Sequence, residues 1–187
     1  MTPELALYYL WALWFASWIA AAFWSNRAAT RPSFLDELPY RLVTLAGAFL
    51  LFGVVGSQRL WALDNNYNWA LCVVCASGFA FCWWARIHLG RLWSGWITKK
   101  ADHRIVDTGP YGIVRHPIYT GVIVAGFATA IVKGTVAALT GAAILTLGFW
   151  VKASLEERFL RNELGPEIYD AYRRRVPMLL PFGPRAA

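Results

Sequence analysis

The chain has 187 residues, of which 58% are hydrophobic and 16% are charged, and it contains 11 tryptophans. This balance lies outside the usual range of soluble domains and indicates a protein embedded in a membrane. The formal net charge of +7 requires no nucleic-acid partner, because basic residues beside a bilayer are attracted to the anionic headgroups of membrane lipids.

Apolar residues occur in long runs that predict transmembrane helices. The first run, about 5–24, contains no charged residue, and about 20 helical residues cross the hydrocarbon at 1.5 Å per residue. A cleaved signal peptide is disfavoured there, because the start of the chain carries Glu4 and no Lys or Arg. The second run, about 40–63, has Arg41 and Arg59 near its ends, where long basic side chains reach the interface.

Three further runs complete the predicted bundle. The third, about 67–87, is uncharged until Arg86. The fourth and fifth, about 117–132 and 134–152, are short and are separated by Lys133–Gly134, which is typical of a helical hairpin with a tight turn. The sequence therefore predicts an all-α integral membrane protein with five transmembrane helices, forming one domain.

The distribution of Lys and Arg predicts the orientation. Sixteen of the 18 lie in the segments that follow the first, third and fifth spans or at their edges, and the other two are Arg59 and Lys133. By the positive-inside rule the N-terminus is outside, as in a multi-pass protein of a prokaryotic inner membrane. The polar segments of about 88–117 and 152–183 then share the cytoplasmic side, and the second is expected to form a C-terminal cytoplasmic helix.

Two short patterns have structural explanations. Cys72 and Cys75 form a CxxC, but they lie mid-span with Cys82 and without a second pair, so helix packing is their expected role. No disulfide or metal site is predicted from them. Arg173–Arg175 is a run of like charge that fits a solvated or lipid-facing helix end.

The densest polar motif, TGPYGIVRHPIYTG at residues 108–121, directly precedes the fourth apolar run. Gly109–Pro110 interrupts any preceding helix, and Pro117 suits the first turn of the next one. His116 is then placed at a helix N-terminus, where unsatisfied N–H groups and the helix dipole favour an anion, with Arg115 as a further donor. An interfacial anchor of Arg, Tyr and His is the alternative interpretation.

A second polar motif starts at Lys152 and reads KASLEERFLRNELGPEIYDAYRRR. Glu156 and Glu157 lie close to the end of the last apolar run, and they can form salt bridges with Lys152 or Arg158. A carboxylate is also a natural acceptor for a ribose diol or an ammonium. Brought beside the anion site by the short hairpin, it predicts a site for a zwitterionic, ribose-containing ligand.

These two motifs resemble those of the isoprenylcysteine carboxyl methyltransferases. The resemblance covers about residues 100–183 in register, whereas the first three spans match that family only in being hydrophobic. The residues that carry the resemblance are His103–Val106, Thr108–Tyr111, Arg115–Gly121, Glu156, Glu157, Gly165, Tyr169, Tyr172, Arg175–Pro177, Pro181 and Phe182.

The resemblance implies an integral membrane methyltransferase that uses S-adenosyl-L-methionine and lacks the soluble Rossmann-type fold. The cofactor would occupy a cytoplasmic pocket closed by the C-terminal segment. The acceptor would be a lipophilic or lipid-anchored molecule, prenyl-cysteine-like for example, that enters from the bilayer. By motif position, the cofactor-binding residues are His103, Arg104, Ile105, Val106, Tyr111, His116, Pro117, Ile118, Tyr119 and Glu156.

Lys152 and Glu157 are the predicted catalytic residues. Lys152 falls where the family usually has an Arg that binds the carboxylate of the acceptor, which favours carboxyl O-methylation. Lys keeps the positive charge of that Arg but loses its bidentate fork. Attack of a carboxylate on a sulfonium methyl neutralises two opposite charges, so a poorly solvated pocket accelerates it without a general base.

Three alternatives remain open. Phospholipid N-methylation would need a base to deprotonate an ammonium, and Glu157 or His116 is the candidate. Sterol-type reductases resemble the C-terminal half, but they carry an Asn and an acid where this chain has Ile118 and Val122, which disfavours NADPH. A non-catalytic membrane protein would leave the paired motifs unexplained. No feature of the sequence predicts the oligomeric state.

Overall fold

The computed structural model describes residues 1–23, 34–53, 58–90 and 105–184. In these ranges the chain is helical, and Arg59 and Thr135 form an isolated antiparallel bridge. The helices are α1 (Pro3–Ala22), α2 (Phe34–Phe52), α3 (Asn65–Leu89), α4 (Pro110–Ile113), α5 (Pro117–Lys133), α6 (Val136–Leu164) and α7 (Pro166–Arg175).

Three of these helices, α1, α3 and α6, are long and apolar enough to cross a membrane. The chain is therefore an all-helical membrane protein. α2 carries three charged residues among its first eight, and α5 has 17 residues, or about 25 Å, against a hydrocarbon thickness of about 30 Å. Whether α2 and α5 also cross, as the predicted count of five requires, stays a prediction.

The second helix lies earlier than the predicted run of 40–63. It begins at Phe34, contains Pro39 and ends at Phe52. Leu60, which the predicted run included, bonds instead to the turn between α5 and α6, where its N–H donates to the Gly134 carbonyl at 2.7 Å. Lys133 Nζ donates to two carbonyls at the end of α2, where the negative end of the helix dipole favours a cation.

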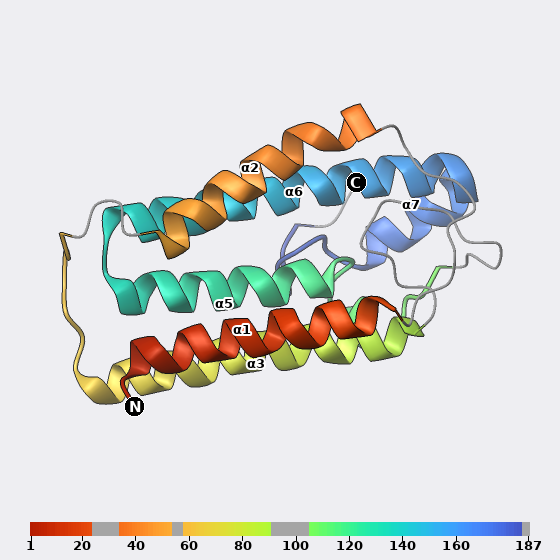
Figure 1. Ribbon diagram of the computed structural model, residues 1–187. Coiled ribbons are helices and arrows are strands. Elements are labelled where there is room, and N and C mark those ends of the chain that lie inside the picture. The colour runs from red at the N-terminus through yellow and green to blue at the C-terminus, as the bar shows by residue number, and fades with distance from the viewer. Residues whose placement is uncertain (24–33, 54–57, 91–104, 185–187) are drawn as a thin grey trace.

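The long helices form one bundle in which α5 and α6 lie side by side (Figure 1). α3 packs on α5 and α1, and α2 packs on α6. Glycines allow the backbones to approach: a Cβ at Gly141 of α6 would lie less than 3.0 Å from the backbone of Gly47 on α2. A Cβ at Gly121 of α5 would meet Gly78 of α3 equally closely. Small residues of this kind are typical of helix contacts in membranes, where lipid provides no hydrophobic drive for association.

Aromatic residues fill the core between α1, α3 and α5. The Trp11 ring meets the Phe79 ring edge-to-face with 4.8 Å between centroids. The Trp11 indole also satisfies its polar atom, because Nε1 donates to Thr129 Oγ1 at 2.9 Å. The thiols of α3 lie buried in this region and are free, in accord with a packing role: Cys72, Cys75 and Cys82.

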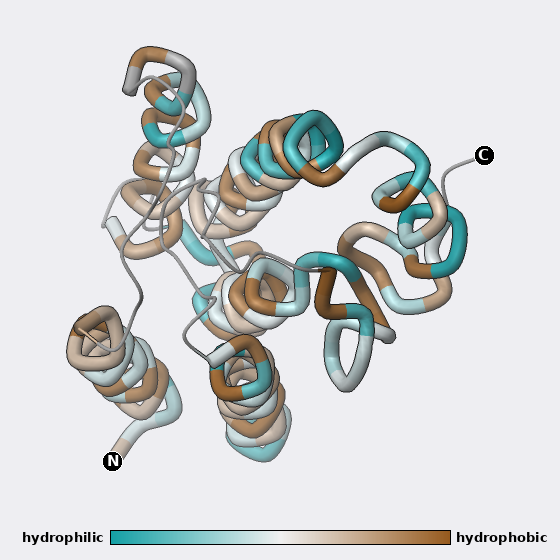
Figure 2. The backbone as a smooth tube through the Cα atoms, turned by 90° about the vertical axis from the view of Figure 1, so that its right-hand side faces the viewer, coloured by the Kyte–Doolittle hydropathy of each residue, from teal (hydrophilic) through white to brown (hydrophobic). Residues whose placement is uncertain are grey.

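The length of α6 positions the polar end of the molecule. Its 29 residues extend about 44 Å, which exceeds the hydrocarbon thickness, so its last turns continue beyond the apolar part of the bundle. α7 folds back beside this extension after Gly165 (Figure 1). In the view along the bundle, α7 and the C-terminal segment lie to one side of α5 and α6, away from α1 (Figure 2).

Candidate functional site

The polar motif before α5 folds as the short helix α4, an extended turn and the first turn of α5. Gly109 precedes α4 with a φ of 57°, which L side chains rarely adopt, and a Cβ there would lie 2.8 Å from the His88 ring. Pro117 occupies the start of α5, where a missing N–H costs nothing. The two residues directly before it, Arg115 and His116, are buried.

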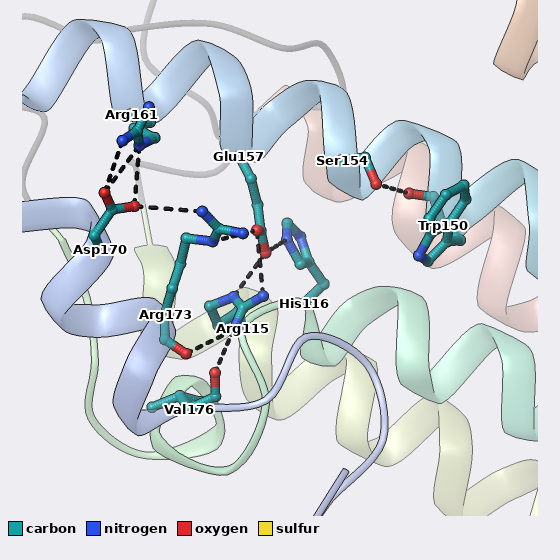
Figure 3. Close-up of polar contacts among 9 residues, drawn as sticks. All are labelled: Arg115, His116, Trp150, Ser154, Glu157, Arg161, Asp170, Arg173 and Val176. Atoms are coloured by element: carbon teal, nitrogen blue, oxygen red, sulfur yellow. Dashed lines mark hydrogen bonds and ion pairs between the residues drawn. The ribbon is translucent and has the colours of Figure 1, made fainter. Parts of the chain in front are cut away.

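Arg115 forms a buried, two-pronged ion pair with Glu157 of α6 (Figure 3). Its Nε donates to Oε1 at 2.6 Å, and its Nη2 donates to Oε2 at 3.2 Å. Its Nη1 donates to the backbone carbonyls of Arg173, at 3.1 Å, and of Val176. Such a pair is geometrically specific, and loss of one partner leaves an uncompensated buried charge. It therefore fixes the turn before α5 against both α6 and the end of α7.

Residues 176–179, called the C-terminal strap here, lie against the same turn. Two of its carbonyls accept hydrogen bonds from the backbone N–H groups of Arg115, at 2.9 Å, and His116, at 3.1 Å. A third accepts from the Thr120 hydroxyl at 2.6 Å. The two sequence motifs thus interlock through the backbone. These two N–H groups and the Arg115 guanidinium are therefore engaged within the protein, and an anion site at the start of α5 stays a prediction.

His116 lies between two carboxylates of α6. Its Nδ1 is 3.5 Å from Glu156 Oε2, and its Nε2 is 3.2 Å from Glu157 Oε1. Burial lowers the pKa of His116, but hydrogen bonds to both glutamates outweigh it, so the pKa of this imidazole is raised above its ordinary value. A protonated imidazole donates from both nitrogens, so this position suits a positioning cation better than a general base.

A cavity of about 390 Å³ opens beside this network, within the size range of small-molecule sites. Its charged groups gather where α5 and α6 meet α7, and the rest of its wall is largely apolar and aromatic. Nine of the twelve predicted site residues line it: Ile105, Val106, Tyr111, His116, Pro117, Ile118, Tyr119, Lys152 and Glu156.

Three predicted site residues are not among the lining residues. His103 and Arg104 lie outside the described residues. Glu157 lies behind the wall, where its carboxylate is shared by Arg115, His116 and the Arg173 Nε, which is 3.3 Å from Oε2. Consecutive residues of a helix point about 100° apart, so adjacent glutamates on α6 cannot face the same space. Sequence spacing placed both near the site but could not tell which one faces the cavity.

Tyr119 joins the charged and aromatic parts of the wall. Its hydroxyl donates to Glu156 Oε1 at 2.6 Å. Its ring stacks on the rings of His116 and Phe149, with centroids 5.4 and 5.0 Å apart. The bond and the two stacked rings hold the Glu156 carboxylate in one place at the cavity.

Lys152 enters the wall from α6 and lies near two tyrosine rings. Its Nζ is 5.2 Å from the centroid of Tyr119 and 5.6 Å from that of Tyr40 on α2. Ammonium groups are attracted to the faces of aromatic rings. Tyr40 is itself buried, and its hydroxyl donates to Glu37 at 3.1 Å. α2 thereby helps to position the Lys152 ammonium, a contribution that the sequence did not indicate.

Several lining residues come from outside the predicted set. Trp14 and Trp18 of α1 share one helix face, four residues apart, and Phe149 lies three residues before Lys152 on α6. The spacing of Trp14 and Trp18 indicated a shared aromatic face on the first helix. Spacing alone cannot show which other helix that face contacts. Tyr169 and Tyr172 belonged to the resemblance without being predicted as lining residues. The others are Leu89, Arg115, Val122, Leu160 and Leu164.

The sequence profile of the isoprenylcysteine carboxyl methyltransferase (ICMT) family matches residues 69–162, half of the chain. The chain belongs to the ICMT family. The matched part begins in α3 and ends on α6 beyond Glu157, so it contains the Arg115–Glu157 pair and most of the charged groups of the cavity. The family membership predicted from the two polar motifs is therefore confirmed, and with it a membrane methyltransferase family.

Individual relatives match shorter parts of this ICMT-family chain. Methanethiol S-methyltransferase 1 of Bradyrhizobium diazoefficiens is 44% identical over 72 residues, 38% of this chain and 24% of the relative. Protein-S-isoprenylcysteine O-methyltransferase of Schizosaccharomyces pombe is 31% identical over 103 residues, 54% of this chain and 43% of the relative. The nickel-cobalt-cadmium resistance protein NccN of Alcaligenes xylosoxydans xylosoxydans is 35% identical over 98 residues, 50% of this chain and 44% of the relative. The matched region spans less than half the length of each of these relatives.

Proposed function

We propose that the protein transfers the methyl group of S-adenosyl-L-methionine to a lipophilic acceptor, with a carboxylate as the favoured acceptor group. The observation that supports this is a cavity in which His116, Lys152 and Glu156 meet an aromatic wall that continues onto α1 at Trp14 and Trp18. A charged end suits a water-soluble zwitterion. An apolar end suits an acceptor that arrives from the bilayer.

The lining residues fit this cofactor. The Glu156 carboxylate, held by Tyr119 and His116, can accept from an ammonium or a ribose diol. Tyr111, Tyr169 and Tyr172 offer aromatic surface of the kind on which a flat base packs. When bound, S-adenosyl-L-methionine supplies an electrophilic methyl group attached to a positively charged sulfur.

The residues of this chain then bind the acceptor, orient it and shield the reacting groups from water. Lys152 attracts a carboxylate and, held between two tyrosine rings, fixes its direction of approach. Trp14, Trp18 and Phe149 exclude water from the apolar part of the cavity, which favours a reaction that neutralises charge. A carboxylate acceptor is already ionised near neutral pH, so none of these residues has to remove a proton.

A thiol acceptor is the second candidate. The relative from Bradyrhizobium diazoefficiens, 44% identical over its matched part, is named for methanethiol, and the wall around Lys152 is largely apolar. The nucleophile of a thiol is its thiolate, which is a minor species near neutral pH because thiols ionise above about pH 8. Lys152 would then stabilise the thiolate, and the rate would depend on pH.

We also propose that α2 and α5 cross the membrane with α1, α3 and α6, and that the cavity faces the cytoplasm of a prokaryotic cell. The support is the concentration of Lys and Arg on the side of the chain that carries α7. Cysteine labelling from either side of the membrane at exposed Glu167, with Leu60 as the opposite position, tests this orientation.

The test of the function is transfer of tritiated methyl from S-adenosyl-L-methionine by purified protein in detergent. The acceptor panel contains a farnesyl-cysteine analogue, a long-chain alkyl thiol and phosphatidylethanolamine. We expect label in the organic phase with the farnesyl-cysteine analogue, released by mild base as a methyl ester would be. Base-stable label on the thiol would favour the second candidate. Absence of both cofactor binding and transfer in folded protein would contradict the proposal.

A further inference from the structure

A second cavity, of about 650 Å³, lies on the opposite face of the α5–α6 pair. The first cavity meets α5 at Ile118, Tyr119 and Val122, whereas the second meets it at positions rotated to the other side of the helix. The end of the chain forms its third wall. Its lining residues are Thr120, Ile123, Val124, Ala143, Thr146, Leu147, Trp150, Pro177, Met178, Leu179, Leu180, Gly183 and Pro184.

The chemistry of this wall favours an apolar ligand. The polar side-chain groups among its lining residues are the hydroxyls of Thr120 and Thr146 and the indole N–H of Trp150, and both hydroxyls donate within the protein. Thr120 Oγ1 donates to the Leu179 carbonyl at 2.6 Å, and Thr146 Oγ1 donates to the Ala142 carbonyl at 2.8 Å. A polar ligand would lose its hydration here and gain few partners from these side chains, whereas a hydrocarbon chain would lose nothing.

The cavity opens toward the bilayer. α6 is one of the helices able to cross a membrane, and its Leu147 and Trp150 are 50% and 52% exposed at the rim. Leu180, on the opposite wall, is 65% exposed. Large apolar side chains exposed on a membrane helix face lipid tails, so the medium at this opening is hydrocarbon.

A basic residue lies at the depth where a lipid headgroup is expected. Leu147 and Arg158 fall on one row of α6, eleven residues or roughly 16 Å apart. One leaflet of hydrocarbon is about 15 Å thick. A phospholipid whose tail packs beside Leu147 would therefore have its phosphate near the exposed Arg158.

We propose that this cavity binds the acyl chain of an anionic phospholipid, and that the bound acyl chain packs against the C-terminal strap and supports it. Met178 and Leu179 line the cavity and also accept hydrogen bonds at the start of α5, from the His116 N–H and the Thr120 hydroxyl. A chain in the cavity supports the strap from the side opposite these bonds. The bound lipid is thereby linked to the position of His116, and the site differs from the one through which an acceptor would reach Lys152.

The test is photo-crosslinking in nanodiscs made with phosphatidylglycerol that carries a diazirine in its acyl chain. After irradiation, peptide mapping is expected to find label on the residues of α5, α6 and the strap that line this cavity. The amount of this label should exceed the amount on α1 and α3. Ala143→Phe fills the cavity and should lower the label on the cavity-lining residues about fivefold or more. Val124→Phe fills it from α5 and serves if Ala143→Phe does not fold.

Two controls separate the explanations. Ala80→Phe makes the same change at an exposed position of α3, outside the cavity, and should leave the label on the cavity-lining residues unchanged. Arg158→Ala should lower label from phosphatidylglycerol but not from a diazirine diacylglycerol, which lacks the phosphate. Equal labelling of all lipid-facing helices, or labelling that neither filling variant changes, would overturn the proposal. The measurement uses no cofactor or acceptor, so its result is independent of the proposed function.

Discussion

Arg115 and Glu157 stand 42 residues apart in the chain and meet through two hydrogen bonds, of 2.6 and 3.2 Å, with both side chains almost fully buried. The pair joins the start of α5 to the extension of α6 at the point where the chain leaves the apolar bundle. It also sets the rotation of α6, so that Glu156, the neighbour of Glu157, faces the cavity. We infer that Glu157 acts by positioning Glu156 and His116.

The first prediction follows from this pair. Glu157→Gln keeps the size of the side chain but leaves Arg115 buried without its counter-charge. Breaking a buried pair in this way costs about 3–5 kcal/mol of unfolding free energy. We expect a large fall in the thermal midpoint of the detergent-purified protein. Arg161→Ala is the matched control. It breaks an exposed ion pair between Arg161 of α6 and Asp170 of α7 and should leave the midpoint nearly unchanged. Equal midpoints for the two variants would show that the buried pair adds no stability.

The second prediction concerns pH and His116. Its pKa is raised in the folded protein, because its bonds to Glu156 and Glu157 outweigh burial, so folding strengthens proton binding. The stabilisation is complete below the unfolded pKa of about 6.5 and is lost as pH rises through the higher folded value. The thermal midpoint should therefore fall as pH rises above about 6.5. His116→Gln, which cannot titrate, should flatten this part of the curve, and an unchanged slope would contradict the assignment.

The third prediction tests the polar end of the cavity by cofactor affinity alone. Glu156→Gln should weaken S-adenosyl-L-methionine binding about tenfold, or about 1.4 kcal/mol, because a charged acceptor is lost. Tyr119→Phe removes the bond that orients Glu156 and should weaken binding by less. Glu167→Gln on α7, an exposed position outside the cavity, is the control. Calorimetry in detergent measures the cofactor affinity of all three variants. Unaltered affinity in Glu156→Gln would show that Glu156 does not bind the cofactor.

The sequence predicted best what depends on local spacing. The motif around His116 and the motif from Lys152 to Glu157 each bring their polar residues together within a few turns, so most of the charged lining could be named in advance. Apolar runs likewise indicated the helices, since hydropathy reports on a window of neighbouring residues. Membership of the ICMT family followed from the same two motifs.

Features that depend on contacts between distant helices could not be predicted. Trp14 reaches the cavity only because α1 packs on α3 and α5, and Tyr40 approaches Lys152 only because α2 packs on α6. Apolar Leu60 looked like the continuation of a span, yet its backbone bonds to the turn at Gly134. The C-terminal strap, more than 60 residues away in the chain, accepts from the His116 N–H, a contact that local spacing does not indicate.

The last prediction separates binding of the acceptor from binding of the cofactor at Lys152. If the acceptor is a carboxylate, Lys152→Ala should leave cofactor affinity nearly intact and raise the KM for the acceptor. Lys152→Arg should stay active or improve, because a guanidinium can meet both carboxylate oxygens. Tyr40→Phe retains the aromatic ring beside Lys152 and should behave like the wild type, whereas Tyr40→Leu should follow Lys152→Ala in part, since it removes that ring.

The pH dependence of the rate in these Lys152 variants identifies the acceptor group without knowledge of the natural substrate. A carboxylate is ionised throughout, so its methylation should give a flat profile above about pH 6. A thiol gives a rate that rises as the pH approaches the pKa of that thiol, and Lys152→Ala should shift the rise to higher pH because a stabilising cation is lost. An amine must lose a proton before it can attack, so its methylation rate also rises with pH. A cation at position 152 would repel the protonated amine, so Lys152→Ala would leave the methylation rate unchanged or raise it. A steep rise to about pH 9 together with a harmless Lys152→Ala would exclude the carboxylate as the acceptor, whichever compound is used in the assay.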